Sequence, residues 1–361
     1  MRIVQLMPTL SYGDAVGNDA LAINDTLKRN GYNTCIYAEN IDKRIDKSIV
    51  KKASELKGLE RDDLIIYHFS TGSKLNAQLR NFSCKIVMRY HNITPYNFFE
   101  GYNPALSELC WQGREQLKAL RNDVEYCIAD SEFNKRDLEE LGFKCNIDVL
   151  PILIPFCDYE KEPDNNVVRR YESDEYINIL FTGRIAPNKR QEDVIAAFHL
   201  YQKYYNPKSR LFMVGSYDGM AIYYNRLRRY AEELHVKNVY FTGHIKFDAI
   251  LAYYRTADLS LCMSEHEGFC VPVVEAMFFG IPIVAYDSTA VGGTLGGAGV
   301  LLSEKNPLET AGMIDYIVNH TELREKMLQN GSERLRDFEH DKIEERFLKY
   351  VKGILGKDYE E

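Results

Sequence analysis

The stretch Ser264–Pro282, SEHEGFCVPVVEAMFFGIP, carries the pattern that decides the fold. Proline favours the first turn of a helix, where its missing N–H costs nothing, and glycine favours the position just after a helix end. Pro272 and Gly280 therefore predict a helix that follows a loop and precedes a strand at IPIVAYD. Glu275 is expected in the first helical turn and Glu267 in the loop before it.

The start of this helix predicts an anion site. The backbone N–H groups of Phe269, Cys270 and Val271 lie at the expected helix N-terminus, and such groups bind anions without a basic side chain. With a carboxylate on each side, the site suits a ligand that has a phosphate in its middle and hydroxyls at both ends, as a sugar nucleotide does. A structural reading stays open, because the helix dipole alone favours a glutamate near a helix start.

Strand and helix patterns alternate along the rest of the chain. RIVQLM, TCIYAE, DLIIYHF, CKIVMRYHN, YCIAD and NIDVLP are strand candidates in the first half, and INILFTGRI, SRLFMVGS, VYFTG and LSLCMS in the second. Strand–helix repetition predicts parallel sheets, and 361 residues are more than one core usually supports. We predict an α/β fold of two doubly wound Rossmann-like domains facing a cleft. The boundaries are 1–150 for the first domain, 151–175 for a linker, 176–335 for the second domain and 336–361 for a C-terminal helix packing across the domains.

Composition excludes several classes of protein. The net charge of −8 gives no overall attraction to nucleic acid. The eight cysteines include no C-x-x-C pair, which indicates buried thiols in a reducing compartment, neither a disulfide framework nor a zinc site. The first apolar run is too short for a signal peptide, and no stretch approaches the roughly 20 apolar residues of a membrane span. We expect a cytoplasmic protein, with peripheral contact at the inner membrane face left open.

A second motif, FTGRIAPNKRQEDVI, begins at Phe181. A buried strand is expected to end at Gly183, where a glycine permits close backbone approach. Arg184 and Lys189 follow, and cations at the carboxyl end of a strand can neutralise a diphosphate leaving group. The alternative is a solvated charge run, which most such runs are.

GRIAPNKR and SEHEGFCVPVVEAMFFGIPIVA, with two glutamates in E-x7-E spacing, resemble the retaining GT-B glycosyltransferases of family four, the group 1 type. HFSTGS, YHNITP and ADSEFNKRDLEELG are similar to the N-terminal domain of that family. The resemblance covers nearly the whole chain and is strongest from 177 to 302. It implies GT-B architecture and metal-independent transfer of a hexosyl group from a nucleoside diphosphate sugar, UDP before GDP, with no cofactor. By analogy the acceptor is a hydroxyl of a glycan or lipid-linked molecule, in bacterial surface polysaccharide synthesis.

The resemblance also implies roles for particular residues. Glu267 would contact hydroxyls of the donor sugar, Glu275 the ribose, and His91 the reacting sugar, although a lone histidine is more often structural. The implied catalytic residues are His91, Glu267, Arg184 and Lys189; the donor-binding residues are Glu275, Gly183, Phe269, Cys270, Val271, Gly243, His244 and Ile245, with the last three near the base and Gly292 to Thr294 in a loop near the phosphates. The acceptor or phosphate loop holds Gly13, Asp14 and Gly17, and Asp14 stands where the family often has a second glycine.

Other readings remain. SYGDAVGND is neither G-x-G-x-x-G nor a P-loop, which disfavours a dehydrogenase or an NTPase. The aromatic segment 96–104 could grip an acceptor, enter a lipid surface or pack on its own domain. Paired carboxylates also suit a glycoside hydrolase, and a sugar-nucleotide binding protein without activity would carry the same donor site. A phosphorylase is disfavoured, because its cofactor lysine motif is not found.

Overall fold

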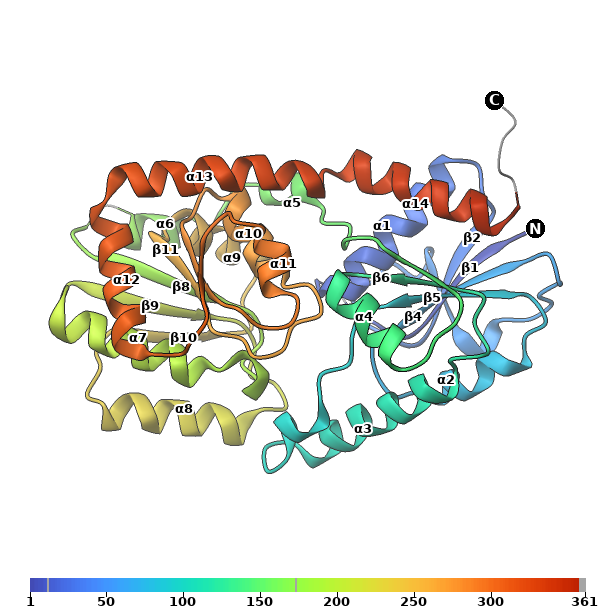
Figure 1. Ribbon diagram of the computed structural model, residues 1–361, viewed down its shortest axis with the longest axis horizontal. Helices are drawn as coiled ribbons and strands as arrows, with labels where there is room; N and C mark the ends of the chain where they lie inside the picture. The colour runs from blue at the N-terminus through green and yellow to red at the C-terminus, as the bar shows by residue number, and fades with distance from the viewer. Residues whose placement is uncertain (12, 173, 357–361) are drawn as a thin grey trace. The chain divides into compact units, whose positions relative to one another are not determined.

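Two parallel β-sheets with helices packed on them make up the computed structural model (Figure 1), which describes residues 1–11, 13–172 and 174–356. The predicted class, α/β with two doubly wound domains, is confirmed. Residues 12, 173 and 357–361 belong to the predicted first loop, linker and C-terminal segment, and they lie outside the described residues. Unit 1 comprises Met1–Asn97, Ala105–Pro155 and Phe338–Glu361, and unit 2 comprises Phe98–Pro104 and Phe156–Asp337.

The described strands of unit 1 form one sheet in the order β3-β2-β1-β4-β5-β6-β7. All residues of β4 are buried, as expected for a central strand covered on both faces. The chain order reverses between the paired strands β1 and β4. The strands are β1 (Ile3–Leu10), β2 (Thr34–Ile41), β3 (Val50–Lys52), β4 (Leu64–Phe69), β5 (Lys85–Tyr90), β6 (Tyr126–Ala129) and β7 (Asn146–Val149); the helices are α1 (Ala15–Arg29), η1 (Ala53–Glu55), α2 (Lys74–Gln78), η2 (Leu79–Asn81), α3 (Pro104–Ala119) after its first residue, α4 (Glu132–Glu140) and α14 (His340–Ile354). The short helices η3 (Tyr96–Phe99) and η5 (Arg336–Phe338) each have residues in both units.

Unit 2 repeats this plan with the strand order β10-β9-β8-β11-β12-β13 in its described part. The order reverses between β8 and β11, which pair in parallel. Helix α12 packs on α7, and α13 packs on α10. The strands are β8 (Ile177–Thr182), β9 (Ser209–Val214), β10 (Val239–Gly243), β11 (Leu259–Cys262), β12 (Ile283–Tyr286) and β13 (Val300–Leu302); the helices are α5 (Phe156–Tyr159), α6 (Asn165–Tyr171), η4 (Pro187–Lys189), α7 (Gln191–Tyr204), α8 (Ala221–Glu233), α9 (Phe247–Arg255), α10 (Val271–Phe278), α11 (Val291–Leu295), α12 (Pro307–Asn319) and α13 (Thr321–Leu335).

The C-terminal helix α14 belongs to unit 1, so the chain returns to this unit after completing unit 2. Ile343, Phe347 and Val351 recur at helical spacing and are buried. Polar contacts fix the helix at its edges, including an ion pair of 2.6 Å between Arg29 on α1 and Glu344. In the described residues, no helix has both the length and the apolar character needed to cross a lipid bilayer.

Two segments differ from the sequence-based expectation. The predicted linker is structured, because α5 and α6 bury Tyr159 and Tyr171 against unit 2. The aromatic segment Phe98–Pro104 groups with unit 2 instead of with the residues that flank it. There the Tyr102 ring meets the Tyr223 ring edge-on at 5.2 Å, and Asn103 Nδ2 donates to Gly219 O at 2.9 Å.

The buried face of α14 leads to a stability prediction. Replacing Phe347 by alanine removes a fully buried ring and leaves a cavity, so we expect the free energy of unfolding of unit 1 to fall by about 3 kcal/mol. Lys349→Ala, at an exposed position of the same helix, is the matched control and should change stability by less than about 0.5 kcal/mol. Urea unfolding measures both, and equal midpoints for the two variants would show that α14 is not part of the folded unit.

Candidate functional site

The candidate site of unit 2 lies where β8 and β11 end, at the point where the strand order reverses. In doubly wound sheets this edge is where ligands bind, because the loops on either side diverge. The loop after β8 contains Gly183, Arg184 and η4, and the loop after β11 leads into α10. Their backbones are joined by a hydrogen bond of 2.8 Å from Glu265 N to Asn188 O. Two predicted motifs far apart in the sequence therefore meet here.

Lys189 and Glu267 form an ion pair across these two loops. Lys189 Nζ lies 2.5 Å from Glu267 Oε1 and 2.6 Å from Oε2. Burial alone would lower the pKa of Lys189, but the Glu267 carboxylate outweighs burial and raises this pKa above its ordinary value. The amine therefore stays charged at neutral pH. An ammonium has three N–H groups, and the two contacts with Glu267 engage two of them.

The backbone of Glu267 is held from a third loop, the one after β12. Thr289 Oγ1 accepts from Glu267 N at 2.8 Å and donates to Glu267 O at 3.0 Å. Thr289 has a φ of 46°, in the left-handed region that threonine rarely adopts. Three loops thus converge to position one carboxylate.

Glu275 lies in the second turn of α10, not in the first as predicted, because the helix begins at Val271. Its Oε2 accepts from Tyr254 Oη at 2.5 Å, and its Oε1 accepts from Tyr159 Oη at 2.8 Å. Burial raises the pKa of Glu275, and the two tyrosine hydrogen bonds offset part of that rise. Gly280 comes just after the helix, as the sequence predicted, and its φ of 63° lies in the left-handed region.

Two of the three residues at the N-terminus of α10 are buried. Phe269 and Cys270 are 5% and 4% exposed, whereas Val271 is partly exposed. The predicted glycine loop from Gly292 to Thr294 is wrong, because these residues form part of helix α11. Thr294 Oγ1 donates to Phe269 O and so ties this helix to the start of α10.

The remaining donor-site residues of the prediction lie at the ends of strands. Gly183 follows β8, and a Cβ at its neighbour Gly215 would lie 2.0 Å from Gly183 O, so the two backbones approach as closely as glycine allows. Gly243 ends β10. After it, His244 is exposed, while Ile245 packs against the apolar core of unit 2. Arg184 is exposed in the loop after β8.

In unit 1, the predicted acceptor loop forms the start of α1. Asp14 is the N-cap residue, and its Oδ1 accepts from Gly17 N at 2.6 Å. A Cβ at Gly17 would lie 2.3 Å from Ser11 O, so only glycine fits there. Gly13 has a φ of 77°. The structure thus gives Asp14 a capping contact with α1, and its contact with a ligand stays a prediction.

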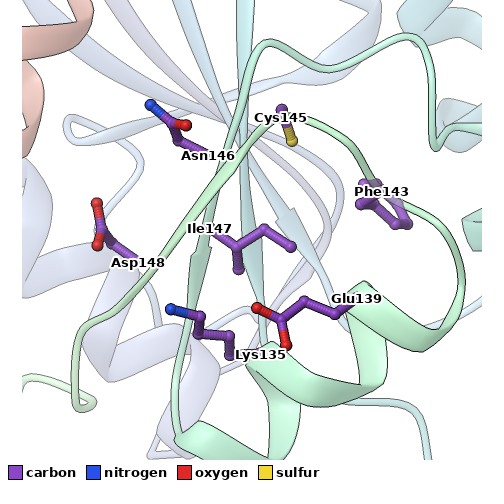
Figure 2. A pocket seen from close by; sticks show the side chains of 7 residues that line it. All are labelled: Lys135, Glu139, Phe143, Cys145, Asn146, Ile147 and Asp148. Carbon is purple, nitrogen blue, oxygen red and sulfur yellow. The ribbon is translucent and has the colours of Figure 1, made fainter.

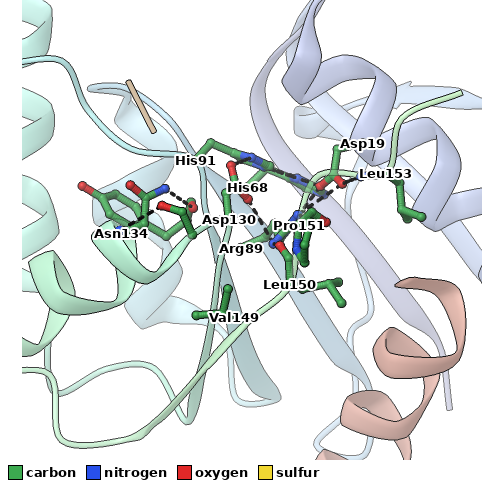
Figure 3. A network of polar contacts seen from close by, with 12 residues as sticks. Asp19, His68, Arg89, His91, Asp130, Asn134, Val149, Leu150, Pro151 and Leu153 are labelled. Atoms are coloured by element: carbon green, nitrogen blue, oxygen red, sulfur yellow. Dashed lines mark hydrogen bonds and ion pairs between the residues drawn. The ribbon is translucent and has the colours of Figure 1, made fainter. Parts of the chain in front are cut away.

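His91 belongs to a buried polar network that the sequence analysis did not foresee (Figure 3). Its Nδ1 lies 2.9 Å from Asp130 Oδ2, and its Nε2 lies 2.8 Å from His68 Nδ1. His68 Nε2 in turn lies 2.8 Å from Gln5 Oε1. Both ring nitrogens of His91 therefore have protein partners.

Arg89 links this network to α1. Its guanidinium bonds Asp19 at 2.9 Å and lies 3.0 Å from Asp130 Oδ1, and all three side chains are buried. Burial would raise the pKa of Asp19, but the Arg89 charge holds it below its ordinary value. The pKa of His68 lies well below its ordinary value, first because of burial. The available signal was an aspartate on the apolar face of a helix and an arginine and a histidine within buried strands, three polar residues that must find partners inside.

A separate hollow in unit 1 lies beside the edge strand β7 (Figure 2). No residue of the predicted site lines it, so its position argues against a role in the same chemistry. The lining residues are Lys135 and Glu139 of α4, Phe143, Cys145, Asn146, Ile147 and Asp148.

The second half of the chain matches the model of a known protein family. Residues 164–334 match the family model of glycosyl transferases group 1. Among curated proteins, a trehalose synthase of Pyrococcus horikoshii is 28% identical over 202 residues, which are 53% of this chain and 47% of that protein. The chain spans about half the length of the first curated relatives that it matches.

Solved structures establish the GT-B fold for nearly the whole chain. Sucrose-phosphate synthase of Thermosynechococcus elongatus superposes with a TM-score of 0.78 at 17% identity, over 99% of this chain and all of that one, 100%. Anabaena HepE in complex with UDP-glucose gives a TM-score of 0.74 at 17% identity, over 98% of this chain and 100% of that one. These likenesses concern the fold.

The Lys189–Glu267 pair is expected to stabilise unit 2 measurably. In a double-mutant cycle of Lys189→Met and Glu267→Gln, urea unfolding should give a coupling of roughly 2 kcal/mol, less than for a fully buried pair because the lysine side chain is 19% exposed. The exposed pair Lys118–Glu115 is the control and should couple by under about 0.5 kcal/mol. Equal couplings in the two cycles would contradict this description.

The buried His68 predicts a pH dependence of stability. The folded chain keeps this ring neutral, whereas the unfolded chain protonates it as pH falls through 6.5, so the unfolded state binds more protons in that range. The contribution of the neutral His68 ring to the free energy of unfolding is therefore present above pH 6.5. Below this pH it is lost by up to about 1.4 kcal/mol per pH unit. Urea unfolding is measured at about pH 7.5 and about pH 5.5, roughly one unit on either side of the ordinary histidine pKa. Between these two values the free energy of unfolding should fall less for His68→Gln than for the wild type. The exposed His320→Gln should behave as the wild type, and an unchanged loss in His68→Gln would disprove the assignment.

Proposed function

We propose, on the premise that residues 164–334 belong to the glycosyl transferases of group 1, that this protein transfers a hexosyl group from a nucleoside diphosphate sugar to an acceptor hydroxyl. The observation that carries the proposal is the Lys189–Glu267 pair at the ends of β8 and β11. The pair places a cation beside a carboxylate, a group that can accept hydrogen bonds from sugar hydroxyls. It lies at the sheet edge where doubly wound sheets bind ligands, inside the region that matches the family model.

Departure of the diphosphate concentrates negative charge on its oxygens. Lys189 can donate its third N–H to a phosphate oxygen without leaving Glu267, and the exposed Arg184 follows the same strand. Cations fixed in place stabilise this developing charge, and each such contact contributes several kcal/mol in typical enzymes. In this proposal they perform the role of a metal ion, and the transfer requires none.

The two glutamates divide the donor between them. Glu267, paired with Lys189, accepts hydrogen bonds from hydroxyls of the transferred sugar. Glu275 accepts from the ribose hydroxyls in addition to its two tyrosines, since each carboxylate oxygen can accept more than one hydrogen bond. Gly183 and the amides of Phe269, Cys270 and Val271 border the phosphates, and the base lies near Gly243, His244 and Ile245.

Unit 1 supplies the acceptor side in this proposal. Gly13, Asp14 and Gly17 border the acceptor or its phosphate. His91 contacts the transferred sugar, for which its Nε2 must exchange His68 for a sugar hydroxyl. Asp130 keeps its hold on Nδ1 during that exchange and so fixes the ring orientation.

The stereochemistry, base and acceptor extend the proposal further. We expect retention at the anomeric carbon by a front-face path, in which the leaving phosphate helps to take the acceptor proton. We expect UDP as the nucleotide of the donor, in agreement with the UDP-glucose bound to the structurally similar HepE. GDP is the second candidate nucleotide. A glycan or lipid-linked acceptor of bacterial surface polysaccharide synthesis fits this donor type by analogy only.

Nucleotide binding tests the donor site first. UDP, GDP and ADP are added separately and the thermal unfolding temperature is recorded; one of them, UDP by expectation, should raise it. Arg184→Ala and Glu275→Ala should lose most of that rise, while Arg228→Ala on the exposed face of α8 should keep it. A rise that is unchanged in both site variants would place the nucleotide elsewhere.

Turnover then separates the candidate activities. With a panel of sugar nucleotides and acceptors, Glu267→Gln should release nucleoside diphosphate roughly a hundredfold more slowly than the wild type. Anomeric configuration in the product, read by NMR, decides retention. Hydrolysis of simple glycosides without any nucleotide sugar would favour a glycoside hydrolase, and tight donor binding with no turnover would favour a binding protein.

A further inference from the structure

Two cysteines of unit 2, eight positions apart in the sequence, meet beside Glu267. Cys262 is the last residue of β11, and Cys270 is the N-cap residue of α10. Their Sγ atoms lie 3.8 Å apart. These sulfur atoms and a carboxylate oxygen of Glu267 all lie within 4.8 Å of one another, and all three residues are buried.

This spacing fits a thiophilic metal ion. Zn–S bonds of about 2.3 Å at a tetrahedral angle place two sulfur ligands roughly 3.8 Å apart. The observed separation of 3.8 Å therefore requires little movement of either side chain. Two thiolates with one carboxylate make a soft ligand set, which suits Zn²⁺ or Co²⁺ and not Mg²⁺.

The backbone of Cys270 gives a second, independent indication. Its φ of 76° and ψ of 61° lie in the left-handed region, where a residue with a Cβ is strained. Glycine would relieve that strain, yet the position holds a cysteine whose side chain is aimed at Cys262 and Glu267. A strained conformation that presents a particular ligand atom is the pattern expected of a site and not of packing alone.

We propose that Cys262, Cys270 and Glu267 bind a thiophilic divalent cation such as Zn²⁺, and that this cation competes with Lys189 for Glu267. Each thiol releases its proton to solvent as its sulfur binds the metal, and no oxidation state changes. The Lys189 side chain is 19% exposed and can turn toward solvent when the metal takes its partner. A water molecule completes the four ligands.

Another buried cluster in the described residues has metal-ligand spacing, but it does not offer the same exchange. Asp19, His68 and His91 also lie close enough to share an ion. Asp19 accepts hydrogen bonds from Arg89, and both side chains are 0% exposed. The Arg89 guanidinium therefore cannot turn toward solvent when a metal ion approaches Asp19. The cysteine site differs because its cation, Lys189, is partly exposed and can move away from Glu267.

The consequence for catalysis rests on the proposed function. With Glu267 bound to a metal and Lys189 displaced, the donor sugar loses a carboxylate and the diphosphate loses a cation. Zn²⁺ therefore inhibits donor binding instead of supporting transfer, and a chelator restores it. Metal binding itself can be measured without substrate, so its failure leaves the transferase proposal standing and a missing transferase activity leaves the metal site standing.

Titration of the full-length, reduced protein with Co²⁺ tests the site directly. A thiolate-to-cobalt charge-transfer band should appear with one equivalent of metal and disappear when Zn²⁺ is added. A thiol assay in denaturant must first give all eight cysteines as reduced. Absence of a thiolate band in this reduced wild type would overturn the proposal.

Variants identify the ligands. Cys262→Ser and Cys270→Ser should each lose the band, and Lys189→Met should bind cobalt about tenfold more tightly because the competing ammonium is gone. Cys127→Ser with Cys145→Ser is the matched control, since these sulfurs lie 3.6 Å apart but belong to no such ligand cluster among the residues that the structure describes. A band that survives in Cys262→Ser, or is lost in the control, would overturn the assignment. Circular dichroism confirms folding, and Cys262→Ala decides the matter should Cys270→Ser unfold.

Discussion

Both sheets bury their central strands on both faces, and this burial limits where polar side chains can lie. Strands such as β4 and β9 satisfy their backbone groups in the sheet and leave little interior room for polar side chains. A polar side chain buried there needs a partner inside the protein. In unit 2 the strand order reverses between β8 and β11, and Lys189 and Glu267 lie in the loops that follow these two strands. In unit 1 the order reverses between β1 and β4, and the buried polar network draws His68 from β4, Arg89 from β5 and Asp19 from α1.

The Lys189–Glu267 pair shows what such an edge can do. Its two residues are 78 positions apart in sequence, and the parallel pairing of β8 with β11 brings their loops together. Each side chain lowers the cost of burying the other, since an isolated buried charge would be far more costly. The same pairing raises the pKa of Lys189, so the amine stays charged at neutral pH, which is the state in which a cation binds phosphate.

Local sequence patterns were enough to predict the fold, but they could not predict contacts between residues that are far apart in the sequence. Pro272 and Gly280 mark a helix through backbone chemistry alone, so the loop–helix–strand unit could be read from sequence. Tyr159 could not be foreseen as a partner of Glu275, because it lies in a segment with no periodic pattern that folds by burying its rings. Nor could Arg89 be matched to Asp19, since 70 residues separate them and only the sheet order brings β5 and α1 together. The short edge strands β3 and β13 have too few residues to give a signal.

The two buried charge clusters use the same forces with opposite consequences. Arg89 is closed on all sides by Asp19 and Asp130, so it fixes the position of Asp130 and through it the ring of His91. Lys189 has one carboxylate partner and a partly exposed stem, so its contact with Glu267 can be exchanged. A rigid network is suited to orienting a group, whereas an exchangeable pair is suited to admitting a ligand. The buried Arg89 network is therefore suited to fixing the orientation of His91, and the partly exposed Lys189–Glu267 pair is suited to rearranging when a ligand binds.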